Sequence, residues 1–243
     1  MAHILTTTAF MATCLVDQIY PEVGIAAVKV LRRVGVQVEY PHGQTCCGQP
    51  FYNSGFVEQA AALAKKTIEI FESYQTVVLP SGSCTAMIRV GYSELFKGDP
   101  EWRERAKALA GKTFELSEFI AKFAKDKMRN NSSPSEASYH DSCHMCRALG
   151  LKEEPRAALA QAGYKIHEMK ESDRCCGFGG LFSLKMPQVS AAITKEKLKE
   201  GIESGAKVLV TADPGCLMQM RAVLEDEEIR VIHFAEALEV QTR

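Results

Sequence analysis

The chain carries the same cysteine array twice. In the first half, one cysteine is followed after 31 residues by a Cys-Cys-Gly triplet and then by a late cysteine; these are Cys14, Cys46, Cys47 and Cys84. The second half repeats the 31-residue gap and the triplet with Cys143, Cys175, Cys176 and Cys216. Separated cysteines that a fold brings together usually bind a metal or a metal cluster. The array therefore predicts a metal-thiolate protein with redox chemistry.

Composition narrows the class of protein. The 243 residues are 46% hydrophobic and 24% charged, with a formal net charge of -1. This balance gives no electrostatic reason to expect a nucleic acid or an anionic membrane as partner. No stretch approaches the roughly 18 to 20 apolar residues of a membrane span, and residues 1–10 lack a signal-peptide pattern. We therefore expect a cytoplasmic protein, in which metal thiolates explain nine cysteines better than disulfides do.

The repeat also predicts the domain organisation. Residues 125–137 are polar and contain Asn-Asn-Ser-Ser-Pro, a composition typical of a linker. We expect a first cysteine-rich domain at 1–124, this linker at 125–137, and a second cysteine-rich domain at 138–243.

Hydrophobic periodicity predicts strands that alternate with helices in each half. The expected strands are 4–10, 36–40, 77–80, 138–141, 165–169 and 208–211, and the expected helices are 22–34, 57–74, 155–162 and 189–204. This order predicts an α/β fold of two tandem, pseudo-symmetric domains, each with a mostly parallel sheet flanked by helices. Each cysteine or cysteine pair follows a strand. Because the ends of parallel strands meet at one edge of a sheet, each set of four cysteines should converge there.

Four cysteines are the usual complement of an iron-sulfur cluster. Consecutive cysteines place two sulfurs on one turn, and Gly48 and Gly177 let the backbone come close enough for amide groups to hydrogen-bond to sulfur. A simple turn role for these glycines is the alternative. The eight arrayed cysteines are therefore the candidate metal and cofactor ligands, with the two glycines as candidates for supporting them.

These motifs resemble those of the cysteine-rich domain repeat proteins, whose signature is a cysteine, a Cys-Cys-Gly and a late cysteine often written Cys-x-x-Cys. Those proteins include the cysteine-rich subunit of heterodisulfide reductase and the iron-sulfur subunit of glycolate oxidase. The two repeats without a ferredoxin domain, together with Cys46-Cys47-Gly48-Gln49-Pro50 and His140-Asp141-Ser142-Cys143-His144, are most similar to the lactate utilization protein A family.

The resemblance implies an iron-sulfur redox subunit of a multi-protein system that oxidises L-lactate to pyruvate. Its implied partners are a ferredoxin-like iron-sulfur protein and a third subunit. The chain shows no nicotinamide, flavin or nucleotide motif. We therefore expect a component of an oxidoreductase complex rather than a complete enzyme, and we assign no catalytic residue.

One departure from the wider signature concerns the late cysteine. Met87 and Gln219 stand where the cysteine-rich subunit of heterodisulfide reductase has a fifth cysteine in each array. The implied cofactor is therefore an ordinary 4Fe-4S cluster, one or two per chain. Zinc in one or both halves, in a structural or assembly subunit, is the first alternative, because tetrahedral zinc sites also take four thiolates. A heterodisulfide-reductase-like thiol-disulfide reductase is the second.

The segment around Cys143 contains three further candidates. Cys146 forms a Cys-x-x-Cys pair with Cys143, but the first half has Asp17 at the equivalent position, so we expect a free or packed thiol. His140 and His144 flank Cys143 and suit a proton relay, a hydrogen-bond donor behind the ligands, or a substitute ligand.

The two halves differ in this respect, because the first half has Met11 and Leu15 at the positions of the histidines. This difference places the second half nearer the chemistry. The charged run at residues 195–200 is expected to be a solvated helix face.

Overall fold

The structure is a computed structural model that describes residues 7–124, 127–128, 135–225 and 228–242. Within these residues it contains two four-stranded sheets in which every paired strand is parallel. The strand orders are β2-β1-β3-β4 and β6-β5-β7-β8. Because both halves have the same order, the structure confirms the predicted α/β fold with two pseudo-symmetric repeats.

The first half contains the strands β1 (Thr8–Phe10), β2 (Val38–Glu39), β3 (Val77–Leu79) and β4 (Thr113–Glu115). Its helices are α1 (Cys14–Gln18), α2 (Pro21–Arg33), α3 (Gln49–Asn53), α4 (Val57–Phe71), α5 (Gly82–Ala86), α6 (Tyr92–Leu95), α7 (Pro100–Ala110) and α8 (Leu116–Phe119). Two π-helical turns, Met87–Gly91 and Ile120–Ala124, follow α5 and α8. The expected strand at 36–40 is shorter than predicted, and residues 4–6 lie outside the described residues.

The second half contains the strands β5 (Ser135–His140), β6 (Tyr164–Ile166), β7 (Val208–Thr211) and β8 (Arg230–His233). Its helices are α9 (Glu153–Gln161), α10 (Leu181–Lys185), α11 (Pro187–Glu203), α12 (Pro214–Val223) and α13 (Phe234–Gln241), with a π-helical turn at His144–Ala148. Strand β5 begins three residues earlier than expected, within the segment 125–137. Residues 125–126 and 129–134 of that segment lie outside the described part of the chain.

Helix α2 shows how local sequence builds the fold. Pro21 occupies its first turn, where the missing N–H costs no hydrogen bond. Buried Val23, Ala27, Val30 and Leu31 recur at helical spacing, which gives the helix one apolar face. Just beyond the end of the helix, Gly35 has a φ of 84°, a conformation that favours glycine.

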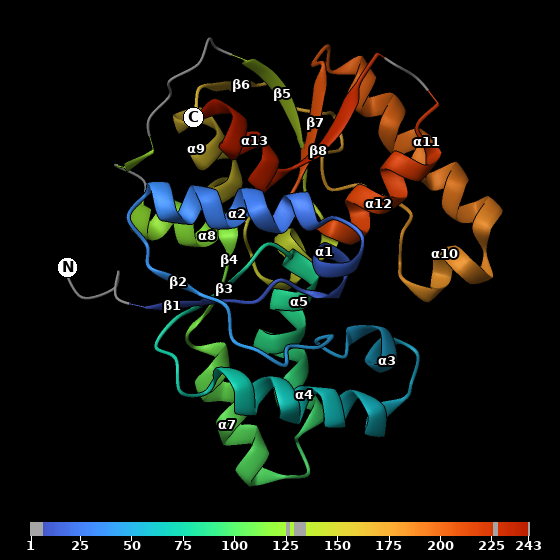
Figure 1. Ribbon diagram of the computed structural model, residues 1–243. Helices are drawn as coiled ribbons and strands as arrows, with labels where there is room; N and C mark the ends of the chain where they lie inside the picture. Colours follow the sequence, from blue (N-terminus) through green and yellow to red (C-terminus); the bar gives the residue numbers. More distant parts are fainter. Residues whose placement is uncertain (1–6, 125–126, 129–134, 226–227, 243) are drawn as a thin grey trace.

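The two halves share a hydrophobic core rather than merely touching. Helix α2 of the first half lies against α13 of the second, and α8 contacts α9, so helices from both repeats fill the space between the sheets (Figure 1). Leu31 of α2 and Leu238 of α13 are fully buried in one cluster, and each burial contributes about 2 kcal/mol. At the edge of this layer, Arg33 and Glu239 form an ion pair with an N–O distance of 3.1 Å. The relative position of the two cysteine arrays is thus set by packing.

Candidate metal site between the two halves

The cysteine-bearing turns follow the carboxyl ends of the strands, as predicted. Cys14 begins α1 shortly after β1, and Cys84 lies in α5 just after β3. The hydroxyl of Ser81 caps α5 by accepting a hydrogen bond from the Cys84 N–H at 3.2 Å. In the second half, the Asp213 carboxylate accepts a hydrogen bond from Gly215 N at 3.0 Å and caps α12, which carries Cys216.

The two arrays meet at a single cavity. All eight arrayed cysteines line a cavity of about 210 Å³ between the halves. The sequence predicts two sets of four, each gathered within its own half; the structure shows in addition that the two sets face the same cavity. The ninth cysteine, Cys146, is half-buried and is not among the described residues that line this cavity.

The contacts that join the halves at this cavity were not predictable from sequence. Ser83 N donates a hydrogen bond to Asp213 Oδ2 at 2.7 Å, and Gly82 N donates to Ala212 O at 3.2 Å. The turn that carries Cys84 is thereby attached to the turn that carries Cys216. Neither Ser83 nor Asp213 belongs to a pattern that sequence reasoning singles out.

In the first half, the sulfurs of Cys14 and Cys46 lie 3.6 Å apart. The Cys14 thiol donates a hydrogen bond to the Cys46 sulfur. This bond lowers the pKa of Cys46, because it stabilises the Cys46 thiolate, and it raises the pKa of Cys14, whose proton makes the bond. The pKa of buried Cys47 is raised by its hydrogen bonds to Cys46 and Cys84 and by burial. The hydrogen bonds of this set therefore favour the thiolate form, which is the form that binds a metal, on Cys46.

In the second half, the sulfurs of Cys176 and Cys216 lie 3.0 Å apart. The hydrogen bond with Cys176 lowers the pKa of Cys216, but burial together with the negative charges of Asp213, Cys143 and Cys175 raises it further, so the pKa is about 11. Gly177 N donates to the Cys175 sulfur at 3.3 Å, the amide-to-sulfur bond expected of the Cys-Cys-Gly turn. Cys175 is the one exposed cysteine of the array, so this part of the cavity wall reaches the protein surface.

His140 lies close to two of these sulfurs. One ring nitrogen of His140 and the sulfurs of Cys176 and Cys216 all lie within 4.8 Å of one another. The residue is 1% exposed, and neither ring nitrogen makes a hydrogen bond of ordinary geometry with the described residues. Burial lowers the pKa of His140 to about 3, so the ring is neutral. A neutral imidazole beside thiols fits the chemistry of a metal ligand.

The two triplet glycines have the conformations that their proposed role requires. Gly48 has a φ of 88° and Gly177 a φ of 90°. A Cβ atom at Gly177 would lie 2.5 Å from Ser190 O and 2.6 Å from Thr194 Oγ1, so no larger residue fits there. At Gly48 the nearest atom, Ala60 O, would be 3.1 Å away. Close approach to a helix therefore explains Gly177 in particular.

The prediction of a solvated face at residues 195–200 is wrong at Lys197. Its side chain is fully buried, and Nζ donates to Glu171 O at 2.6 Å and Ser172 O at 3.1 Å. Lys197 thus holds the loop that leads to Cys175 against α11. Ser190, Thr194, Lys197 and Gly201 recur at helical spacing on one buried face of α11, but none of them is a large apolar residue, so the sequence carries no apolar pattern that would indicate the burial of Lys197.

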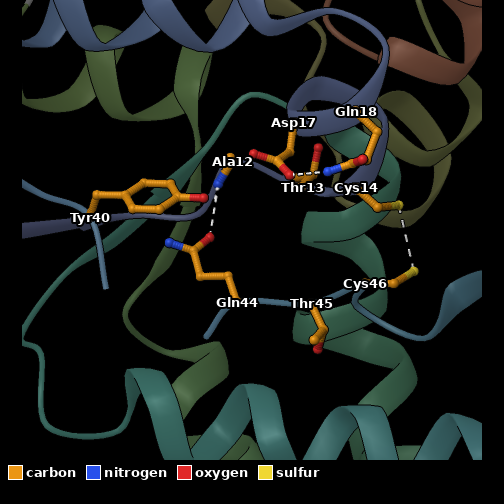
Figure 2. A pocket seen from close by; sticks show the side chains of 9 residues that line it. All are labelled: Ala12, Thr13, Cys14, Asp17, Gln18, Tyr40, Gln44, Thr45 and Cys46. Carbon is orange, nitrogen blue, oxygen red and sulfur yellow. Dashed lines mark hydrogen bonds between the residues drawn. The ribbon is translucent and has the colours of Figure 1, made fainter. Parts of the chain in front are cut away.

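A second cavity, of about 270 Å³, lies beside the first array (Figure 2). Thr13, Cys14 and Cys46 line both cavities, so they form part of the wall between them. Figure 2 shows the side chain of Gln44 reaching Ala12, and its oxygen accepts a hydrogen bond from the Ala12 N–H at 3.1 Å. The side-chain nitrogen of Gln44 also donates a hydrogen bond to Phe10 O at 2.9 Å. Gln44 therefore attaches the segment before Cys46 to the end of β1.

Comparison with known proteins agrees with this description. A family model described as a cysteine-rich domain, with the label CCG, matches residues 8–89 and 137–221. Fold and site together therefore define a protein built from two cysteine-rich domains.

Two curated relatives identify the family to which the chain belongs within this class of proteins. Lactate utilization protein A 1 of Bacillus anthracis (strain CDC 684 / NRRL 3495) is 44% identical over 229 residues, which cover 93% of this chain and 95% of the relative. Lactate utilization protein A of Halalkalibacterium halodurans is 45% identical over 234 residues, covering 95% and 96%. This chain belongs to the lactate utilization protein A family, as its motifs indicated.

The fold also occurs among solved structures. A hypothetical protein from Helicobacter pylori superposes with a TM-score of 0.71 at 10% sequence identity. The match covers 97% of this chain and 49% of that chain, so this chain spans about half the length of that protein. At this identity the likeness concerns the fold alone.

Proposed function

We propose that this protein is an iron-sulfur redox component of lactate utilization, which passes electrons through cysteine-bound clusters during the oxidation of L-lactate to pyruvate. The observation that carries the proposal is the convergence of all eight arrayed cysteines on one cavity between the halves. The relatives named lactate utilization protein A support the substrate class.

The donor set fits such clusters. Cys14, Cys46, Cys47 and Cys84 would hold one cluster, and Cys143, Cys175, Cys176 and Cys216 would hold a second; four thiolates each favour the 4Fe-4S type. Bound clusters of this type supply one-electron redox chemistry.

The chain itself contributes burial, charge and hydrogen bonds to this site. Cys47, Cys84, Cys176 and Cys216 are buried, which keeps water from the inner sulfurs. The N–H of Gly177 donates to the Cys175 sulfur, and the Cys14 thiol stabilises a thiolate on Cys46. Such hydrogen bonds tune the affinity of thiolates for electrons and metal.

We propose that the chain acts with partner subunits, a ferredoxin-like iron-sulfur protein and a third protein, in the cytoplasm. Oxidation of a 2-hydroxy acid normally needs a hydride acceptor, and the sequence carries no motif for one. Among the described helices, none has the length and apolar composition that crossing a bilayer requires.

The test is the metal content of the chain purified without air. Iron, zinc and acid-labile sulfide are measured per polypeptide for the parent chain, Cys46→Ser and Cys175→Ser, with Cys146→Ser as the control. We expect about four or about eight irons with matching sulfide, a loss confined to one half in each array variant, and no loss in the control. Absence of iron and sulfide from the parent chain would overturn the proposal.

The proximity of His140 to Cys176 and Cys216 favours a second candidate, a structural zinc site in the second half. In that case the protein would be an assembly subunit of the same kind of complex. Zinc without sulfide, lost in Cys176→Ser and kept in Cys46→Ser, would identify this function.

A further inference from the structure

We propose that Gln49 is a positioning residue that reaches across the boundary between the halves and fixes the tautomer of His144. Gln49 follows the first Cys-Cys-Gly triplet, whereas His144 follows Cys143 in the second array. Their side-chain nitrogens, Nε2 of Gln49 and Nε2 of His144, lie 3.2 Å apart, and both residues line the shared cavity. Gln49 thereby holds the imidazole with its Nδ1–H toward the sulfur of Cys143.

The direction of each hydrogen bond follows from a third group. The same Gln49 nitrogen lies 3.0 Å from the carbonyl oxygen of Ser83. A carbonyl oxygen only accepts, so the atom facing it must be the NH₂ group of the amide and not its oxygen. An amide NH₂ only donates, so Nε2 of His144 must be the accepting nitrogen. The orientation of the amide is therefore determined by its surroundings.

The tautomer of His144 follows in turn. A neutral imidazole carries one proton, and if Nε2 accepts from Gln49, that proton is on Nδ1. Nδ1 lies 3.8 Å from the Cys143 sulfur, within reach of an N–H to sulfur hydrogen bond. The result is a chain of hydrogen-bonding groups from Ser83 and Gln49 of the first half to His144 and Cys143 of the second.

This chain of groups exists on one side of the pseudo-symmetric site only. At the equivalent positions in the other corner of the cavity, Leu15 replaces His144 and Phe178 replaces Gln49, and both line the cavity. Neither side chain can donate or accept a hydrogen bond. Cys143 therefore receives a ring N–H that its counterpart Cys14 does not, which makes the two arrays chemically different.

The inference concerns side chains of the protein itself, so it stands apart from the proposed function and is tested without an activity assay. Ring ¹⁵N–¹H correlation spectra of the full, reduced chain, recorded without air at a pH where the ring is neutral, report which nitrogen carries the proton. The His144 signal is assigned by its loss in His144→Asn. We expect the proton on Nδ1 in the parent chain.

Gln49→Glu is the informative variant. Its carboxylate has the same shape but only accepts, so it should draw the proton of His144 to Nε2. A parent chain with the proton on Nε2, or a Gln49→Glu chain that keeps it on Nδ1, would overturn the assignment. The signal of His233, which is buried and is not among the described residues that line the cavity, verifies that the variant is folded.

A double-mutant cycle provides a second measurement that does not depend on the spectra. We expect Gln49→Ala and His144→Ala to be coupled by about fivefold in the unfolding equilibrium constant. Gln44→Ala is the matched control, because its amide also joins two segments beside the first array, through hydrogen bonds to the backbone of Ala12, Phe10 and Pro41. The effects of Gln44→Ala and His144→Ala on the free energy of unfolding should be additive. Additive effects of Gln49→Ala and His144→Ala would contradict the proposal.

Discussion

Replacement of Gly177 by alanine should destabilise the second half strongly. The φ of 90° at this position disfavours any residue with a Cβ, at a cost of about 1–2 kcal/mol. The added methyl group would also lie 2.5 Å from Ser190 O, a distance that forces the turn away from α11. That movement breaks two hydrogen bonds of 2.8 Å, from Ser190 Oγ to Gly177 O and from Thr194 Oγ1 to Cys176 O. Each is worth about 1 kcal/mol, so the total loss is about 3–4 kcal/mol.

Gly205 provides the matched control. It has a φ of 81°, and no atom lies within 4 Å of the position that a Cβ would take. Gly205→Ala should therefore cost only the backbone part, about 1–2 kcal/mol.

The assay is urea unfolding of the full chain in reducing, air-free buffer, followed by circular dichroism. We expect Gly177→Ala to lose about 2 kcal/mol more than Gly205→Ala, the equivalent of the two hydrogen bonds. Equal losses would refute the argument that the Cys-Cys-Gly turn must approach α11 closely.

Three further predictions use the same unfolding assay. Lys197→Met should cost about 2 kcal/mol, because two carbonyl oxygens lose their buried donor, whereas exposed Lys199→Met should change little. Arg156→Met should cost about 3–5 kcal/mol, because it leaves the buried Asp141 carboxylate without the guanidinium that contacts both its oxygens at 2.8 Å; a loss below 1 kcal/mol would contradict this. Burial raises the pKa of Glu115 from 4.5 to about 8. The folded state therefore holds a proton that the unfolded state releases, and stability should fall between pH 5 and 8 by up to about 1.4 kcal/mol per pH unit. Glu115→Gln should flatten this slope, and an unchanged slope would disprove the assignment.

The proposed function and the Gln49 inference fail in different ways. Loss of iron or sulfide tests the ligands, whereas the tautomer of His144 tests a hydrogen bond between side chains of the protein. A chain with zinc in place of iron could still show the proton on Nδ1 of His144. The two experiments therefore address separate statements about the same cavity.

The repeat, the class of fold and the candidate ligands were all predictable from the order of the amino acids. The spacing of the cysteines can be read directly along the sequence. Helices such as α2 and α4 were predictable because their apolar residues recur at the period of a helix. The short motifs around Cys46 and Cys143 also pointed to the family that the comparisons established.

How the two arrays meet depends on the three-dimensional packing of the chain. Packing of α2 against α13 brings the halves together so that eight cysteines line one cavity, and no local pattern encodes that contact. Tertiary contacts also bury Lys197 against the loop at Glu171 and Ser172 and place Gln49 beside His144, although 95 positions separate the latter pair. Periodicity reflects interactions between near neighbours in the chain, whereas these contacts depend on how whole helices fit against one another.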